Sequence, residues 1–195
     1  MIIGITGGTG CGKTTALEAI RQLGGMVLDC DAIYHELLRS DNALRSAIEA
    51  RFPGTVTDGA LDRKKLGAIV FSDAQALADL NSITHSAVEK KVLEQLAAAP
   101  RLAAIDAIGL FESKLSDLCD VTVAVTAPEA DRVARLMARD NITEDYAKMR
   151  IQAQHSQQTY VDLCDYCLEN TGTQPQFLDK CLAFFRQIAI IKENS

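Results

Sequence analysis

The sequence predicts an α/β domain with a mostly parallel β-sheet, and three observations support this prediction. Short apolar runs alternate with segments of helical periodicity, which is typical of strands joined by helices in a parallel sheet. A glycine-rich turn separates the first apolar run from the first helical segment. A long, almost wholly helical stretch separates the second strand from the third. Ligands of such sheets bind at the carboxyl ends of the strands, so the residues that follow each strand are the candidates for a site.

Five strands are expected, each a short apolar run that ends near a turn: residues 2–6, 26–28, 102–105, 121–125 and 166–168. Helices are expected where apolar residues recur at helical spacing: residues 13–23, 33–38, 44–52, 66–71, 77–96, 129–139 and 143–157, with a last helix after the capping-box pattern at 173–176. Asp62 and Thr143 are placed to cap the helices that follow them, and Asp58-Gly59 marks a turn.

Composition and charge exclude several classes of function. A net charge of −6 over 195 residues argues against a nonspecific nucleic-acid binder, which needs a basic face. No apolar run approaches the length that spans a bilayer, and no targeting segment is visible before the first strand. We therefore expect a cytoplasmic protein whose six cysteines are reduced. Cys164 and Cys167 form a C-x-x-C pair without a second pair, so buried thiols are the favoured interpretation over a metal or redox site.

The segment from Gly7 to Thr14 fits the phosphate-loop spacing G-x-x-x-x-G-K-[ST], with a strand before it and a helix after it. Backbone amides of such a loop point at phosphate oxygens, and the helix that follows adds the positive end of its dipole. Lys13 is expected to reach the β- and γ-phosphates and Thr14 to ligate Mg²⁺. The nucleotide-binding residues expected on this basis are Gly8, Thr9, Gly10, Cys11, Gly12, Lys13, Thr14 and Thr15. The thiol of Cys11 predicts a site that is potentially sensitive to thiol reagents.

Two carboxylates, Asp29 and Asp31, follow the second strand and are expected at the same sheet edge as the phosphates. Asp31 fits a proton acceptor for an attacking hydroxyl, and its position also permits a simple role as helix cap. Arg132, Arg135 and Arg139 share one face of a helix. Such a face is either a solvated surface or a lid that closes over a triphosphate.

Several classes of phosphate-loop protein are distinguishable by what else the sequence contains. A switch GTPase needs an N-K-x-D motif, which is absent, and the D-x-x-G match at residues 106–109 is weak alone. A hydrolytic motor is normally longer. A short chain with a helical insertion and an arginine-bearing helix is more typical of a small-molecule kinase.

The ordered set of motifs resembles the dephospho-coenzyme A kinase family over nearly the whole chain. The segments that carry the resemblance are Ile5 to Thr14, Asp29-Cys30-Asp31, Leu61-Asp62-Arg63, Val70-Phe71, Leu80 to His85, Leu110-Phe111-Glu112, and Asp165 through Asn170-Thr171-Gly172. The resemblance implies one P-loop kinase domain over residues 1–195 with three parts. These are a core at about 1–31, 101–127 and 158–195, a helical acceptor-binding insertion at about 32–100, and an arginine-containing lid at about 128–157.

The resemblance also implies a reaction in which ATP, with Mg²⁺, phosphorylates the ribose 3′-hydroxyl of dephospho-CoA to give CoA and ADP. Asp31 matches the family's proposed base, Arg139 its lid arginine and Asn170 a residue near the adenine, so the implied catalytic residues are Asp31, Lys13 and Arg139. The implied acceptor contacts are Asp29, Arg63, His85 and Leu110. Neither a nucleic acid nor a membrane is an expected partner.

The chain departs from the family pattern in three places. Ser86 follows His85 where a proline is usual, residues 106–112 lack the usual proline and one leucine of the acceptor loop, and Cys11 replaces a usual serine in the phosphate loop. Two alternatives therefore stay open: a P-loop kinase of another small acceptor such as a nucleoside or nucleotide, and a nucleotide-dependent switch or binding module.

Overall fold

The computed structural model describes residues 1–193, with side chains described through residue 189. The chain divides into two compact units. The first comprises Met1–Leu28 and the chain from Ala99 onward, and the second comprises Asp29–Ala98.

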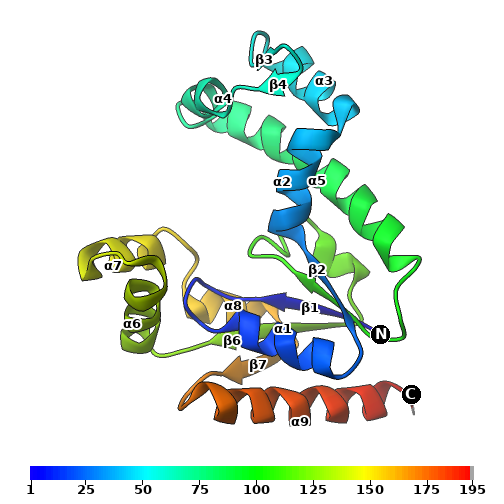
Figure 1. Cartoon of the computed structure of the whole chain (residues 1–195), viewed down its shortest axis with the longest axis vertical. Helices are drawn as coiled ribbons and strands as arrows, with labels where there is room; N and C mark the ends of the chain where they lie inside the picture. The colour runs from blue at the N-terminus through cyan, green and yellow to red at the C-terminus, as the bar shows by residue number, and fades with distance from the viewer. Residues whose placement is uncertain (194–195) are drawn as a thin grey trace. The chain divides into compact units, whose positions relative to one another are not determined.

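The first unit is built on a five-stranded sheet in the order β2-β5-β1-β6-β7 (Figure 1). Its strands are β1 (Ile2–Thr6), β2 (Met26–Asp29), β5 (Ala103–Asp106), β6 (Val121–Thr126) and β7 (Tyr166–Glu169). The pairs β1–β5, β1–β6 and β6–β7 are parallel, with Ile3 opposite Ala104 on one side and Val121 on the other. This arrangement confirms the predicted α/β fold with a parallel sheet and brings the residues after β1 and β7 to the same edge.

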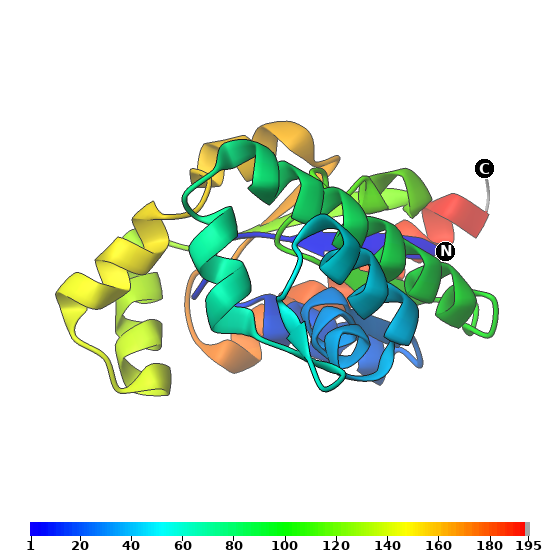
Figure 2. The same cartoon turned by 90° about the horizontal axis from the view of Figure 1, so that it is seen from above.

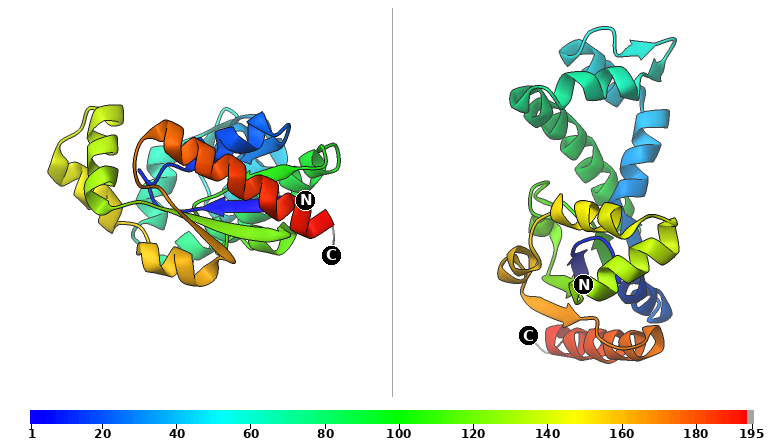
Figure 3. Two further views of the ribbon diagram at one scale, coloured as in Figure 1. Left: turned by 90° about the horizontal axis from the view of Figure 1, so that it is seen from below. Right: turned by 90° about the vertical axis from the view of Figure 1, so that its left-hand side faces the viewer.

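Helices flank this sheet. They are α1 (Lys13–Gln22), α6 (Glu129–Asp140), α7 (Glu144–Gln152), α8 (Gln157–Leu163) and α9 (Gln174–Glu193), and a 3₁₀ helix spans Leu115–Leu118. Helices α1 and α9 pack side by side along the sheet (Figure 3), because their apolar faces share a core with the central strands. Ile3, Ile5, Phe177 and Phe185 are fully buried in that core or nearly so. Helices α6 and α7 pack against each other around the buried Leu136 and Ala147 (Figure 2).

The second unit consists mainly of helices, as the sequence predicts. It contains α2 (Cys30–Ser40), α3 (Asn42–Arg51), α4 (Arg63–Val70) and α5 (Ala74–Leu96). Each of the other three helices packs against the long α5 (Figure 1). Ile48 and Val92 are fully buried in this unit. A two-stranded hairpin, β3 (Val56–Thr57) and β4 (Ala60–Leu61), lies before α4. Its turn at Asp58-Gly59 was expected, but strands of two residues are too short to produce an apolar pattern.

Aspartates cap every helix of the second unit. The capping carboxylates are those of Asp29, Asp41, Asp62 and Asp73, each accepting a hydrogen bond from a backbone amide in the first turn. The cap predicted at Asp62 is confirmed, with Lys65 N donating at 2.9 Å. The alternative role of Asp31 as a cap is corrected: α2 begins at Cys30, two residues earlier than that role requires, and Asp29 accepts from Ala32 N at 2.9 Å.

The helix expected at 143–157 is two helices. Thr143 caps α7 as predicted, but α7 ends at Gln152. Ser156 then caps α8, accepting a hydrogen bond from Thr159 N at 3.1 Å. A serine followed by two glutamines is compatible with either a continuous helix or a new helix start, so the periodicity alone does not reveal the break. Across residues 1–193, no helix has both the length and the apolar character needed to cross a bilayer.

Candidate nucleotide-binding site

The loop between β1 and α1 has the backbone geometry of a phosphate cradle. Gly10 and Gly12 have φ of 77° and 102°, which side chains disfavour, and a Cβ at Gly12 would collide with the Asn170 side chain. The α1 helix begins at Lys13, so its positive end faces the loop. Lys13 Nζ donates to the Gly7 carbonyl at 2.9 Å, which holds the ammonium across the loop. Thr14 is exposed in the first turn of α1.

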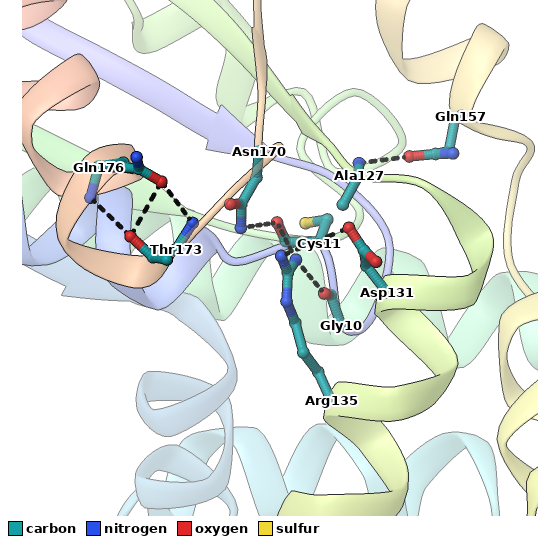
Figure 4. A network of polar contacts seen from close by, with 9 residues as sticks. All are labelled: Gly10, Cys11, Ala127, Asp131, Arg135, Gln157, Asn170, Thr173 and Gln176. Atoms are coloured by element: carbon teal, nitrogen blue, oxygen red, sulfur yellow. Dashed lines mark hydrogen bonds and ion pairs between the residues drawn. The ribbon is translucent and has the colours of Figure 1, made fainter.

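Two of the three arginines on α6 contact the loop. Arg132 Nε donates to the Thr9 carbonyl at 2.9 Å, and Arg135 Nη1 donates to the Gly10 carbonyl at 3.2 Å (Figure 4). Arg139 lies elsewhere: it bonds to Asp140 at 2.7 Å, and its side chain is 59% exposed. The sequence predicted the cluster but not which members face the loop.

Arg132 is the most deeply buried arginine of this helix. Its exposed fraction is 3%, and burial lowers the pKa of its guanidinium. Its Nη2 atom has no hydrogen-bond partner among the residues that the structure describes. A buried guanidinium nitrogen without an acceptor is costly, so a ligand oxygen here would be stabilising.

Asn170 supports the loop from the other side. It follows β7, is buried, and donates from Nδ2 to the Cys11 carbonyl at 2.8 Å (Figure 4). The Thr173–Gln176 capping box lies directly after it and is confirmed, with Thr173 N donating to Gln176 Oε1 at 2.9 Å. The cap fixes the start of α9 and with it the turn that presents Asn170 to the loop.

The thiol of Cys11 is not available as the sequence suggested. Its side chain is buried, and burial raises the pKa of the thiol above its ordinary value. The expected sensitivity to thiol reagents is therefore wrong, because both access and ionisation are reduced. Of the C-x-x-C pair, Cys164 is half-buried and Cys167 exposed, so the interpretation as two buried thiols is also wrong. Among the side chains described, those of residues 1–189, no group of three or more His, Cys, Asp or Glu could hold a metal.

The predicted acceptor contacts are distributed over both units. In the second unit, Asp29 is occupied as the α2 cap, Asp31 is exposed in the first turn of α2, Arg63 is exposed at the start of α4, and His85 lies half-buried within α5. In the first unit, Leu110 is fully buried. A Cβ at Gly4 would lie 2.8 Å from a Leu110 methyl, so this leucine packs beneath β1.

Sequence reasoning missed Gln154. This residue lies between α7 and α8, and its Oε1 accepts a hydrogen bond from Thr9 N at 2.7 Å. No local pattern marks a glutamine that bonds to a residue 145 positions away. Gln154 follows the end of α7, which carries no sequence feature that points to the loop.

The class of protein is a P-loop kinase. Three features define it: a parallel sheet, a glycine-rich loop that leads into a helix, and arginines of α6 that contact this loop. A family model for dephospho-CoA kinase matches residues 1–176, and the chain belongs to this family. The dephospho-CoA kinase of Lactobacillus acidophilus is 35% identical over 186 residues, covering 92% of each chain. This chain is accordingly an ATP-dependent kinase.

Solved structures are similar to this chain over its whole length. A Thermus thermophilus protein of known crystal structure is 32% identical, with a TM-score of 0.80 over 100% of this chain and 98% of its own. The dephospho-CoA kinase from Campylobacter jejuni is 27% identical, with a TM-score of 0.69 over 100% and 98%.

Proposed function

We propose that this kinase transfers the γ-phosphate of ATP to the ribose 3′-hydroxyl of dephospho-CoA, giving CoA and ADP, in the cytoplasm. This reaction is the last step of coenzyme A biosynthesis. The observation that carries the proposal is the phosphate loop held by Arg132, Arg135 and Asn170, in a chain that belongs to the dephospho-CoA kinase family.

The donor side rests on the loop. Amides of residues 8–15 would bind the phosphates, and Lys13 would leave the Gly7 carbonyl to contact the β- and γ-phosphates. The exposed Thr14 hydroxyl fits one ligand of Mg²⁺, a cation that keeps several waters and so needs few protein ligands. Mg²⁺ bound there would neutralise charge on the phosphates. Asn170 would hold the loop in place, through its hydrogen bond to the Cys11 carbonyl, on the side that faces the adenine of ATP.

The acceptor side rests on Asp31. Its carboxylate is exposed, and the capping role that competed with catalysis belongs to Asp29. A free carboxylate directly after a strand of the sheet fits a base that accepts the proton of the attacking hydroxyl. Arg63, His85, Asp29 and Leu110 are proposed to contribute to the acceptor pocket, Asp29 and Leu110 through helix capping and packing.

The segments keep the roles that the resemblance implies. Residues 32–100 are the proposed acceptor-binding insertion and residues 128–157 the proposed lid. Arg139 would have to leave Asp140 to reach the transferring phosphoryl group, whereas Arg132 and Arg135 already contact the loop.

An acceptor panel tests the proposal. ADP release is followed with ATP and Mg²⁺ in the presence of dephospho-CoA, adenosine, AMP, shikimate or no acceptor. The proposal predicts stimulation by dephospho-CoA far above every other acceptor. Stimulation only by another acceptor would identify a different kinase, and ATP binding without stimulated turnover would favour a switch or binding module.

A further inference from the structure

Side chains of the segment 128–157 bond to both backbone polar groups of Thr9. Arg132 Nε donates to the Thr9 carbonyl at 2.9 Å, and Gln154 Oε1 accepts from the Thr9 amide at 2.7 Å. The amide is one of those that a phosphate loop directs at phosphate oxygens. A carboxamide oxygen therefore occupies a donor that the nucleotide needs.

A hydrogen-bond donor, Arg132 Nη2, lies close to Gln154 Oε1 and has no acceptor among the described residues. A Cβ at Gly8 would lie 2.5 Å from Arg132 Nη2 and 3.3 Å from Gln154 Oε1, so both atoms lie on one side of Gly8. Nη2 is buried and has no acceptor among the described residues. The carboxamide oxygen thus satisfies the Thr9 amide but leaves the adjacent guanidinium nitrogen unsatisfied.

We propose that Gln154 is a placeholder for a phosphate oxygen: its carboxamide oxygen accepts from the Thr9 amide until a phosphate of the nucleotide displaces it. A phosphate oxygen is charged and can accept from the Thr9 amide and Arg132 Nη2 together, whereas the neutral Gln154 oxygen accepts from the amide alone. The exchange therefore favours the nucleotide and releases the segment between α7 and α8 from the loop.

This inference rests on the proposed binding of ATP phosphates by the loop, and it predicts an unusual sign. A glutamine that only supported the loop would weaken ATP binding when removed. A placeholder competes with ATP, so its removal strengthens binding. Gln154→Ala should bind ATP about three- to tenfold more tightly than the wild type, because one neutral hydrogen bond no longer has to break. Gln154→Glu should bind ATP about tenfold more weakly, because a carboxylate competes better for the amide and for Arg132.

Isothermal titration with ATP and Mg²⁺ measures these affinities without an acceptor. Gln158 offers a control on the exposed surface of α8, where its Nε2 donates to Asp162 Oδ1 at 2.7 Å. Gln158→Ala should leave ATP affinity unchanged, and thermal melts establish that every variant is folded. The placeholder is supported if Gln154→Ala binds ATP most tightly, the wild type less tightly and Gln154→Glu most weakly. ATP affinity in Gln154→Ala that is equal to or below the wild-type value overturns it, even if the wild type phosphorylates dephospho-CoA. A wild type that binds ATP and fails to phosphorylate dephospho-CoA overturns the proposed function and leaves the order of affinities as the test of the placeholder.

Discussion

The side chain of Asn170 is hydrogen-bonded to the carbonyl of Cys11, 159 residues away in the chain, at 2.8 Å. Both residues are buried, and the bond links the turn after β7 to the floor of the phosphate loop. The same amide nitrogen occupies the space that any side chain at position 12 would need. Position 12 must therefore be glycine for the Asn170 side chain to reach the Cys11 carbonyl.

Replacing Asn170 should destabilise the protein through this contact. Asn170→Ala removes the donor that lies 2.8 Å from the buried Cys11 carbonyl and leaves it Arg135 Nη1 at 3.5 Å, which costs about 0.5–1.5 kcal/mol. Asn170→Asp should cost more, because a carboxylate would then face the carbonyl. Urea unfolding measures both, with Asn81→Ala, at an exposed position of α5, as the control. Equal stability of Asn170→Ala and the wild type would contradict a supporting role.

Asp29 and Asp31 should separate into a structural and a catalytic carboxylate. Asp31→Asn should lower kcat by a factor on the order of 10² while leaving ATP affinity nearly unchanged, because an amide cannot accept the hydroxyl proton. Asp29→Asn should keep most activity and stability, since asparagine also caps helices, whereas Asp29→Ala should lose about 0.5–2 kcal/mol of stability. Steady-state kinetics and denaturant unfolding measure the two effects. A near-normal kcat in Asp31→Asn would contradict the role of Asp31 as the catalytic base.

Lys13 is expected to be essential for phosphate handling. Lys13→Ala should lower kcat/KM by a factor on the order of 10² or more, because the charge on the β- and γ-phosphates loses its compensating ammonium. Lys180 is a matched control: its Nζ also donates to a backbone carbonyl, that of Glu169, at 2.8 Å. Lys180→Ala should keep full activity. Unchanged turnover in Lys13→Ala would count against the loop as the nucleotide site.

Thiol labelling should distinguish the exposed cysteine from the buried ones. Cys167 is exposed and should react first with a thiol reagent at pH 7.5, whereas Cys11 should stay unmodified until the protein unfolds. Burial raises the pKa of Cys11, so its thiolate fraction stays below that of an unburied thiol as the pH rises. Peptide mass spectrometry over time gives the order of labelling. Early modification of Cys11 would restore the thiol sensitivity that the structure argues against.

Alkaline pH should destabilise the fold through Cys181. Burial raises the pKa of this thiol to about 12, above the ordinary value that it regains on unfolding. The stabilisation is complete below the unfolded pKa of about 8.5 and is lost as the pH rises toward the folded value. The melting temperature of the wild type should therefore fall above pH 8.5, and it should fall less steeply in Cys181→Ala. Parallel slopes for the two proteins would contradict this assignment.

Local sequence patterns predicted the parts of the site that are local. The strand at residues 2–6 and the start of α1 at Lys13 are confirmed, because a buried strand, a glycine-rich turn and a helix are each visible within a few residues. The contacts of Arg132, Gln154 and Asn170 with the loop were not predictable, since they depend on how distant segments pack. Asp31 and Asp29 were indistinguishable as caps because both stand where α2 could begin.

Transfer of labelled phosphate tests the central claim most directly. The protein is incubated with [γ-³²P]ATP, Mg²⁺ and dephospho-CoA, and the products are separated and the labelled position identified by mass spectrometry. We predict label on the ribose 3′-oxygen of CoA, with transfer by Lys13→Ala slower by a factor on the order of 10² or more under the same conditions. Label that appears only in inorganic phosphate, or on another acceptor in preference to dephospho-CoA, would contradict the account.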